Sequence, residues 1–349
     1  MSRPSLPDSD VNLSAPAAAD GERVEPVAGR FDWRATARRV ASFRELALIV
    51  ILGLTGLIVS ALNRNFLTPG NLQSILIGLV PGAIIAVGMA MLLVSGGFDL
   101  SVAAVMALCG TVVAYLIDKG MAIPLALLLT LLLGMVIGAG NGVLVTFFKI
   151  NPLIATLGSL SVARGIALVM TEGYNISDLP AAFLVAGATG PLGLPWMVWI
   201  MVVLVVLGDL ALRWTGFLRQ LYYIGGNERA ARLSGIPVDA LRIFTYVLSG
   251  ILSAVAGILL ASRLNTAVPT AGEGLELTVI AAAVIGGASL AGGEGTVLGA
   301  VLGVIFLSVI SNALTILSIS VLWQEVVTGV VLLTAVSLDR LLRRRAQAQ

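Results

Sequence analysis

The sequence predicts an all-α membrane protein in which about ten helices span the bilayer. Of its 349 residues, 58% are apolar and 11% are charged, whereas a soluble domain has about 25% charged residues. The apolar residues occur in long runs, and about 20 residues of helix cross a bilayer core of about 30 Å. The basic residues cluster at those ends of the runs that belong on one side of the membrane. A soluble fold is therefore not expected.

The predicted spans follow one another along the chain. We expect them at residues 45–62, 74–94, 99–117, 122–147, 152–171, 195–213, 240–263, 275–290, 296–317 and 320–337. The span at 275–290 is short and ends in two glycines, so neighbouring helices have to cover its backbone, because lipid offers no hydrogen bonds. A re-entrant arrangement over 275–317 would replace two spans without moving any basic residue, and it stays open as an alternative.

The two ends of the chain differ in composition from the spans. Residues 1–44 are rich in Pro, Ala, Asp and Arg and contain no apolar stretch, so they lack the apolar region of a signal peptide. We expect them to form a disordered cytoplasmic tail. Residues 45–340 would form the transmembrane domain, and residues 341–349 a basic cytoplasmic C-terminal tail.

The positions of the basic residues orient these spans. Those that flank the outermost spans are Arg34, Arg38, Arg39, Arg44, Arg340, Arg343, Arg344 and Arg345. Those in connections predicted on the same side are Lys149, Arg213, Arg219, Arg229, Arg232 and Arg242. Only Arg64, Lys119 and Arg263 lie in connections predicted on the opposite side. The positive-inside rule then places both termini in the cytoplasm, which requires an even number of spans.

Residue counts exclude most soluble enzyme chemistries. The chain has no histidine and a single cysteine, Cys109, so it offers no Ser-His-Asp triad, no histidine metal site and no CxxC redox pair. Its net charge of +2 predicts no nucleic-acid partner. A phosphate-binding loop needs a lysine after glycine, and the two lysines, Lys119 and Lys149, follow Asp118 and Phe148. The chain therefore offers no phosphate-binding loop of this kind.

One connection on the predicted cytoplasmic side, residues 214–239, is longer than a turn. From Thr215 to Ala240 the sequence reads TGFLRQLYYIGGNERAARLSGIPVDA. Asn227 after two glycines is typical of a helix N-cap, and Gly235 and Pro237 are typical of a helix end. The expected helix of about two turns is too short to be stable alone, so it needs a surface against which to dock. A solvated connector is the alternative.

Four stretches resemble the membrane subunits of ribose-type sugar ABC importers. In chain order they are SGGFDLSVAAVMAL, NGVLVTFFKINPLIATLGSLSVARGIALVMTEG, GGNERAARLSGI and PTAGEGLELTVIAAAVIGGASLAGGEGTVLGA. The resemblance runs from about residue 45 to 340. It implies the type II importer permease architecture, in which a second identical or related permease, an ATPase dimer and a periplasmic sugar-binding protein are partners. ATP and Mg²⁺ would be held by the ATPase, and this chain would bind no cofactor.

The resemblance also implies a function and a location. The chain would be a permease in the bacterial inner membrane, surrounded by lipid, that translocates a monosaccharide such as a pentose, a hexose or a polyol. It would be a transport subunit and no enzyme. An ion-coupled secondary transporter of a small polar solute is the alternative. Such transporters usually carry acidic residues or histidine near the midplane, whereas the few acidic residues here lie near the ends of spans.

The family's coupling helix, which contacts the ATPase, corresponds to the expected short helix. The matching residues are Gly225, Gly226, Asn227, Glu228, Arg229, Ala230, Ala231, Arg232, Leu233, Ser234 and Gly235. Gly226 and Gly235 would permit a close backbone approach. Glu228, Arg229 and Arg232 would offer complementary charge to the partner.

Four polar residues in or beside the spans are candidates for the solute pathway. Asp99 either caps a helix that starts at Leu100 or contacts solute. Glu276 either lines the pathway or contacts the binding protein. Asn141 and Asn312 either donate hydrogen bonds to a hydroxylated solute or join neighbouring helices. Arg164 lies near the outer end of its span, where it would extend to the surface.

Glycines within the spans have a simpler role. We expect close helix packing, without solute contact, for Gly88, Gly110, Gly134, Gly138, Gly140, Gly158, Gly299 and Gly303.

Overall fold

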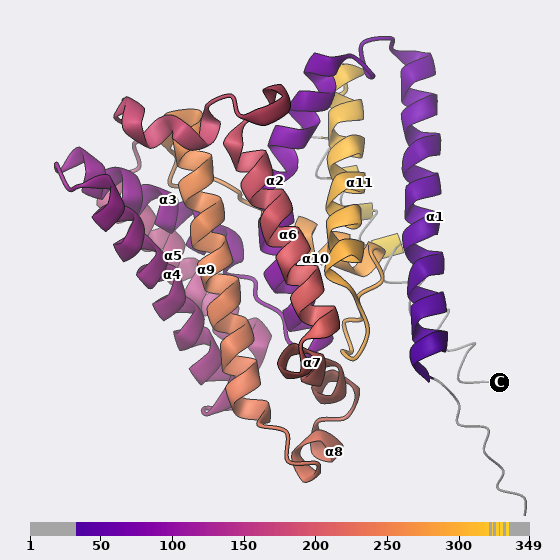
Figure 1. Ribbon diagram of the computed structural model, residues 1–349. Coiled ribbons are helices and arrows are strands. Elements are labelled where there is room, and N and C mark those ends of the chain that lie inside the picture. The colour runs from indigo at the N-terminus through magenta and orange to yellow at the C-terminus, as the bar shows by residue number, and fades with distance from the viewer. Residues whose placement is uncertain (1–32, 321–322, 324–325, 328, 331–332, 335–349) are drawn as a thin grey trace, which may run out of the picture.

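The computed structural model describes residues 33–320, 323, 326–327, 329–330 and 333–334. Figure 1 shows a bundle of helices. They are α1 (Trp33–Leu62), α2 (Pro69–Val94), α3 (Val102–Asp118), α4 (Ile123–Thr146), α5 (Pro152–Thr171), α6 (Trp196–Trp214), α7 (Gly216–Gly226), α8 (Glu228–Leu233), α9 (Val238–Leu264), α10 (Leu275–Ile285) and α11 (Val297–Ile316). Two-residue strands, β1 (Ile176–Ser177) and β2 (Thr266–Ala267), and the 3-10 helices η1 (Ala181–Gly187) and η2 (Pro191–Gly193) complete the described part.

The predicted all-α membrane architecture is confirmed. Seven of the described helices, α1, α2, α4, α5, α6, α9 and α11, contain stretches long and apolar enough to cross a membrane, and α3 and α10 are shorter apolar helices. Most of the expected span at 320–337 lies outside the described residues. Helix α1 begins at Trp33, so residues 33–44, which we assigned to the tail, continue the first helix, and no Gly or Pro interrupts them.

Two of the expected spans are shorter than predicted. Helix α3 begins at Val102 rather than at residue 99, and α10 ends at Ile285 rather than at residue 290. At a rise of 1.5 Å per residue, α10 covers about 16 Å, roughly half of a bilayer core. The chain forms two separate helices here, α10 and α11, and α10 alone is too short for a full span, so the re-entrant arrangement stays an alternative. The loop at 286–296 connects α10 with α11.

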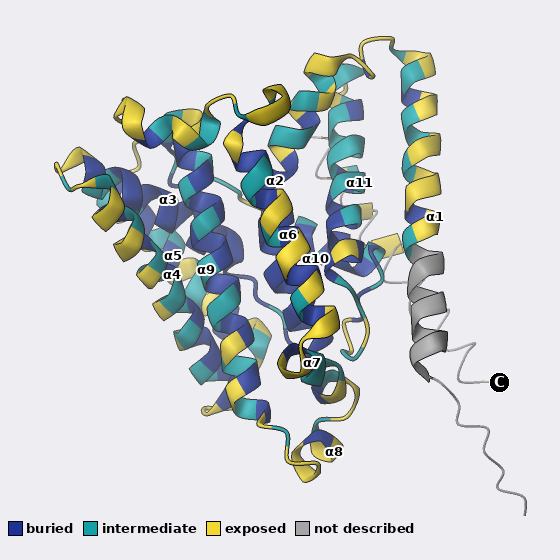
Figure 2. Cartoon of the chain, viewed as in Figure 1, coloured by how far each residue is buried: buried dark blue, intermediate teal, exposed yellow. Residues whose placement is uncertain are grey.

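Helix α2 lies at the centre of the bundle. Of its most apolar window, 83% is buried, against 11% for α1 and 22% for α4 and α5. It packs against α6, α9, α10 and α11. Figure 2 shows the corresponding exposed bands on α1 and α6. The exposed side chains of the peripheral helices are mostly Leu, Ile and Val, as expected for surfaces that face lipid or another subunit.

Helices α4 and α9 approach one another through glycine. A Cβ on Gly134 would lie 2.5 Å from Gly250 O, and a Cβ on Gly138 would overlap Tyr246 O. Both positions follow the packing role that the sequence predicts. Gly140 and Gly158 differ, because a Cβ on either would meet nothing within 4 Å. These two glycines border an open groove, described below, rather than a helix contact.

The two ends of the bundle carry different structures. At one end, β1 pairs with β2 in antiparallel register, with Ile176 opposite Ala267. At the other end, α7 and α8 connect α6 with α9, and α1 begins at this same end (Figure 1). The segment that the sequence singles out is thus separated from β1 and β2 by the length of the spanning helices.

Candidate functional site

Helix α7 lies across the end of the bundle because it is amphipathic. Leu218, Leu221 and Ile224 follow a spacing of three and are buried against the ends of the spanning helices. Thr215 begins the helix, and its Oγ1 accepts a hydrogen bond from Leu218 N at 3.3 Å. Sequence analysis missed α7, because Gly225 and Gly226 suggested a turn. Both glycines are the last residues of this helix.

Helix α8 is the short helix that the sequence predicts. Asn227 precedes it in an extended conformation, and its Oδ1 accepts a hydrogen bond from Ala230 N at 3.0 Å. Gly235, with φ of +79°, ends the helix, and Ile236 N then donates to Ala231 O at 3.1 Å. A left-handed residue at this position is the usual helix terminator. The predicted start and end signals are therefore correct.

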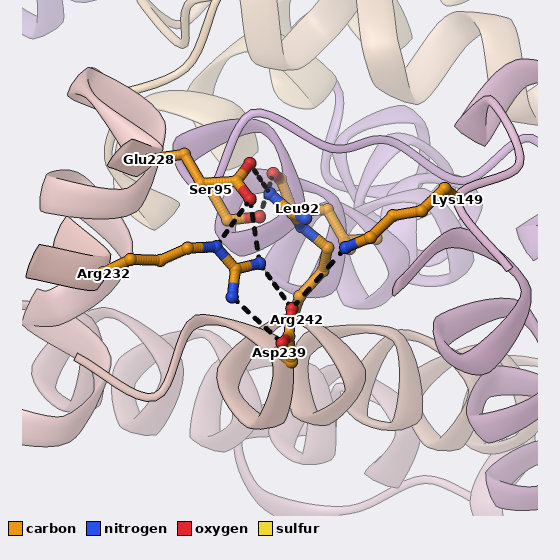
Figure 3. Close-up of polar contacts among 7 residues, drawn as sticks. All are labelled: Leu92, Ser95, Lys149, Glu228, Arg232, Asp239 and Arg242. Carbon is orange, nitrogen blue, oxygen red and sulfur yellow. Dashed lines mark hydrogen bonds and ion pairs between the residues drawn. The ribbon is translucent and has the colours of Figure 1, made fainter. Parts of the chain in front are cut away.

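The charged residues of α8 are paired within the chain. Arg242 of α9 donates to Glu228 Oε2 at 2.7 Å, and Arg232 donates to Glu228 Oε1 at 2.9 Å. Arg232 also binds Asp239 through two hydrogen bonds, and Lys149 lies 4.0 Å from the same carboxylate. Figure 3 shows the side chains of Glu228 and Arg232 directed toward Asp239 and Arg242. We call Glu228, Arg232, Asp239 and Arg242 the α8 ion cluster.

This cluster stabilises one orientation of α8. The guanidinium groups of Arg242 and Arg232 hold the pKa of Glu228 below its ordinary value, against the opposing effect of partial burial. Hydrogen bonds to Asp239 and then to Glu228 raise the pKa of Arg232 further. Because these groups are already paired, the charges predicted to contact a partner act first on the geometry of the chain itself.

The outer surface of α8 carries residues that lie outside the α8 ion cluster. Leu233 is 84% exposed, although it is a large apolar side chain. Arg229 and Ala230 are exposed as well, and Arg229 forms no ion pair with another described residue. Ser234 donates its hydroxyl to Ala230 O at 2.9 Å. Leu233 is thus the large apolar side chain that α8 leaves exposed.

Asp99 and Asn141, two of the pathway candidates, belong to one buried polar network. Asp99 is 2% exposed, and its Oδ1 accepts hydrogen bonds from Ser101 N at 2.8 Å and Ser101 Oγ at 2.6 Å. Asn141, 1% exposed, donates to Ser101 Oγ at 2.9 Å. Ser159 of α5 donates to Asn141 Oδ1. Asp99 therefore does not begin a helix at Leu100 as expected. It orders the turn before Ser101, which is the N-cap of α3.

The network borders a groove between α3, α4 and α5. The groove has a volume of about 660 Å³, and its lining is mostly apolar. Asn141 and Ser159 are polar residues in its wall, beside Gly140 and Gly158. Sequence analysis found Asn141 but missed Ser101 and Ser159. Their distance in sequence, 40 and 18 residues from Asn141, left no local signal.

The other two pathway candidates lie elsewhere. Asn312 of α11 forms a reciprocal amide pair with Asn71 of α2, with hydrogen bonds of 2.8 and 2.9 Å. Glu276 lies in the first turn of α10 and is partly exposed. The four candidates thus do not form a single site. Arg164 donates to Pro269 O at 2.8 Å and Ala271 O at 3.2 Å, so it binds the α9–α10 connection instead of extending freely to the surface.

A second charged network was also missed from sequence. Arg213 of α6 binds Asp209 at 2.6 Å and Glu45 of α1 at 3.3 Å. Asp209 accepts a hydrogen bond from Leu298 N at 3.2 Å, and Glu45 accepts one from Thr296 Oγ1 at 2.8 Å. The network therefore joins α1, α6 and the N-terminal end of α11.

Comparison with known proteins identifies the family to which the chain belongs. Residues 71–336 match the family described as "Branched-chain amino acid transport system / permease component". The chain is 41% identical to the ribose import permease protein RbsC of Bacillus subtilis over 91% of this chain and 98% of that protein. It is 38% identical to the L-arabinose transport system permease protein AraH of Escherichia coli, over 79% and 84% of the two chains.

A third relative is the autoinducer 2 import system permease protein LsrC of Escherichia coli. The identity is 35%, over 86% of this chain and 88% of the relative. No solved structure matches the chain. These similarities favour an importer permease over the ion-coupled alternative, and a transport component over an enzyme. The chain belongs to the family of permease components of the branched-chain amino acid transport type, and it is a multi-pass inner-membrane importer permease.

Proposed function

We propose that the chain carries a monosaccharide, most closely a pentose such as ribose, across the inner membrane as the permease of an ABC importer. The observation that carries this substrate class is the 41% identity to a ribose import permease over 91% of the chain. A similar match to an L-arabinose permease supports the same class. The protein would work as a pair of permease subunits, with an ATPase dimer and a periplasmic sugar-binding protein as partners.

Helix α8 would be the contact to the ATPase. It lies at the end of the bundle, beyond α7 (Figure 1). Its ion cluster fixes it against α9, and Leu233 extends outward. An apolar side chain that enters a groove of the partner contributes binding energy, whereas the charges, being paired already, contribute orientation. Residues 225–235 stay the predicted coupling segment, with Leu233 as its docking side chain.

The orientation of the chain follows from this role. ATP is hydrolysed in the cytoplasm, so the end with α7 and α8 would be the cytoplasmic end. Helix α1 begins at that same end, which agrees with a cytoplasmic N-terminus. The predicted cytoplasmic C-terminus lies outside the described residues.

The groove between α3, α4 and α5 would form part of the solute path. Asn141 and Ser159 place an amide and a hydroxyl in an otherwise apolar wall, which suits a solute that carries hydroxyl groups on a small carbon frame. Asp99 lies behind them, bound to Ser101, and would position Asn141. Glu276 stays a prediction as a pathway residue, whereas Asn312 would join α2 to α11 through its pair with Asn71.

Uptake into proteoliposomes tests the substrate class. The permease is reconstituted with its cognate ATPase and binding protein, and ATP-dependent uptake is measured for labelled ribose, L-arabinose and leucine. We expect uptake of a pentose and none of leucine, which represents the amino-acid branch of the family. Uptake of leucine alone would overturn the sugar assignment.

The role of α8 has its own test. Leu233→Asp places a charge on the proposed docking side chain, and we expect the detergent-solubilised permease to lose its ATPase on co-purification. Leu192→Asp is the matched control, because Leu192 is 87% exposed but lies in η2, at the opposite end of the bundle. Equal retention of the ATPase by both variants would contradict docking through α8.

A further inference from the structure

Three glycine-containing segments, far apart in sequence, cross one another beside α8. They are the α2–α3 loop at Gly96, the end of α7 at Gly225, and the α10–α11 loop at Gly292 and Gly293. A Cβ on Gly225 would overlap both Val94 O and Gly293 N, and a Cβ on Gly292 would lie 2.8 Å from Gly225 Cα and 3.0 Å from Gly96 Cα. Backbone therefore touches backbone, with no side chain between. We call this contact the glycine crossing.

Hydrogen bonds fix the three segments to one another at this point. Gly293 N donates to Val94 O at 2.9 Å, which joins the α10–α11 loop to the end of α2. Tyr222 of α7 donates its hydroxyl to Gly295 O at 2.8 Å. In Figure 1 the α10–α11 loop runs from the middle of the bundle down to α7. Helix α7 is therefore in direct contact with the α10–α11 loop and with the end of α2, where the α2–α3 loop begins.

The glycine crossing is adjacent to α8 in the chain. Gly225 is separated from the N-cap Asn227 only by Gly226, and α7 and α8 pack against each other. Close-packed backbone has little space in which to absorb a shift, so neighbouring elements move together. Any movement of α8 that follows ATPase closure thus reaches Gly225 first.

From the glycine crossing, the α2–α3 loop leads to the buried polar network. Residues 95–101 are not helical, and most of them are buried. Tyr246 donates to Phe98 O at 3.0 Å, and the loop ends at Asp99 and Ser101. Ser101 Oγ then accepts the hydrogen bond from Asn141, which lines the groove. The loop connects the end of α2 with the wall of the proposed solute path.

We propose that Gly225 and Gly292 are positioning residues for transport: through the glycine crossing, movement of α7 and α8 displaces the α2–α3 loop and, with it, Asn141. The proposal rests on the docking of α8 to an ATPase. It assigns the coupling step to a backbone contact inside the membrane subunit, beyond the surface that touches the ATPase.

The test compares Gly225→Ala with Gly216→Ala in the reconstituted complex. Both glycines lie in α7, but a Cβ at Gly216 meets nothing within 4 Å. For Gly225→Ala we expect the amount of solute transported per ATP hydrolysed to fall about tenfold or more, because overpacking separates the segments. Gly216→Ala should keep the wild-type ratio. A wild-type amount of solute transported per ATP in Gly225→Ala would overturn the proposal. The docking of α8 is tested separately, by ATPase binding of Leu233→Asp.

Hydrogen exchange of the wild-type complex gives a second test, which does not depend on whether Gly225→Ala folds. A non-hydrolysable ATP analogue should change the exchange of residues 94–101 and 289–295 together with that of α7. Tyr222→Phe, which removes only the hydrogen bond to Gly295 O, should weaken this shared response. A response confined to α7 and α8, with both loops unchanged, would contradict transmission through the glycine crossing.

Discussion

Glu228 at the start of α8 accepts a hydrogen bond of 2.7 Å from Arg242 in α9. This ion pair spans 14 residues of sequence and closes the connection that contains α8. Arg232 binds the same carboxylate on its other oxygen. A helix of six residues is not stable in isolation, so these contacts, together with the N-cap, define its position.

Reversing the charge of Glu228 should release α8. Glu228→Lys places a third positive group beside Arg232 and Arg242, and like charges at this distance repel. We expect ATPase co-purification to fall about tenfold, because α8 would adopt its docking orientation in a smaller fraction of the molecules. Glu273→Lys makes the same charge change at an exposed site outside the α8 ion cluster and should retain the ATPase. If Glu228→Lys bound the ATPase as well as this control, the orientation of α8 would not matter for docking.

The orientation of α8 should depend on pH. The pKa of Glu228 is lowered from its ordinary 4.5, so its ion pairs are fully present above 4.5 and are lost as the pH falls below that value. A spin label on Ser234→Cys reports this, because the native Cys109 is buried and does not compete for the label. We expect label mobility to rise below pH 4.5, and to be high at every pH when Glu228→Gln is added. Label mobility that is independent of pH in both proteins would contradict a role of the Glu228 ion pairs in orienting α8.

Local sequence signals predicted some elements and not others, for identifiable reasons. The N-cap Asn227 and the terminator Gly235 act within one turn of α8, so a single stretch of sequence contains them. Helix α7 was missed because glycine disfavours helix interiors. Gly225 is nevertheless helical. Glycine is required there because the segments that cross it leave no space for a side chain. The information that decides this position comes from two distant segments.

The buried network shows the same limit. Apolar run length predicted the spans to within a few residues for most helices, because the bilayer sets that length. The start of α3 was misplaced because residues 95–101 are irregular, although most of them are buried by neighbouring elements. The sequence identified Asp99 and Asn141 as unusual polar residues. Only tertiary packing brings Asn141 into contact with Ser101 and Ser159.

The two polar residues of the groove should have separable effects. Asn141→Leu removes the amide that donates to Ser101 and accepts from Ser159, and we expect a loss of about 1 to 3 kcal/mol in unfolding free energy together with lower uptake. Ser159→Ala keeps the bond from Asn141 to Ser101, so uptake affinity should fall without a comparable loss of stability. Ser74→Ala, an exposed serine on α2, is the control. Unchanged uptake by Ser159→Ala would remove the groove from the solute path.

The amide pair between Asn71 and Asn312 should act on stability alone. Each single replacement by Leu leaves one amide without its partner, whereas the double replacement removes both. A double-mutant cycle on thermal unfolding should give a coupling of about 0.6 kcal/mol, with a maximum of about 1.7 kcal/mol. The KM for uptake should stay unchanged in all three variants. A raised KM in Asn312→Leu without coupling to Asn71 would restore Asn312 as a pathway residue.

Arg164 should order the connection between α9 and α10. Its guanidinium donates to two carbonyls, Pro269 O and Ala271 O, from a helix that is more than 100 residues away in sequence. Arg164→Met keeps the apolar stem but removes both donors. We expect amide exchange in residues 268–274 to rise about fivefold, which corresponds to about 1 kcal/mol of lost local stability. Arg64→Met, at an exposed arginine of the α1–α2 connection, should leave that segment unchanged. Equal exchange in the two variants would mean that the backbone of the connection holds its shape without Arg164.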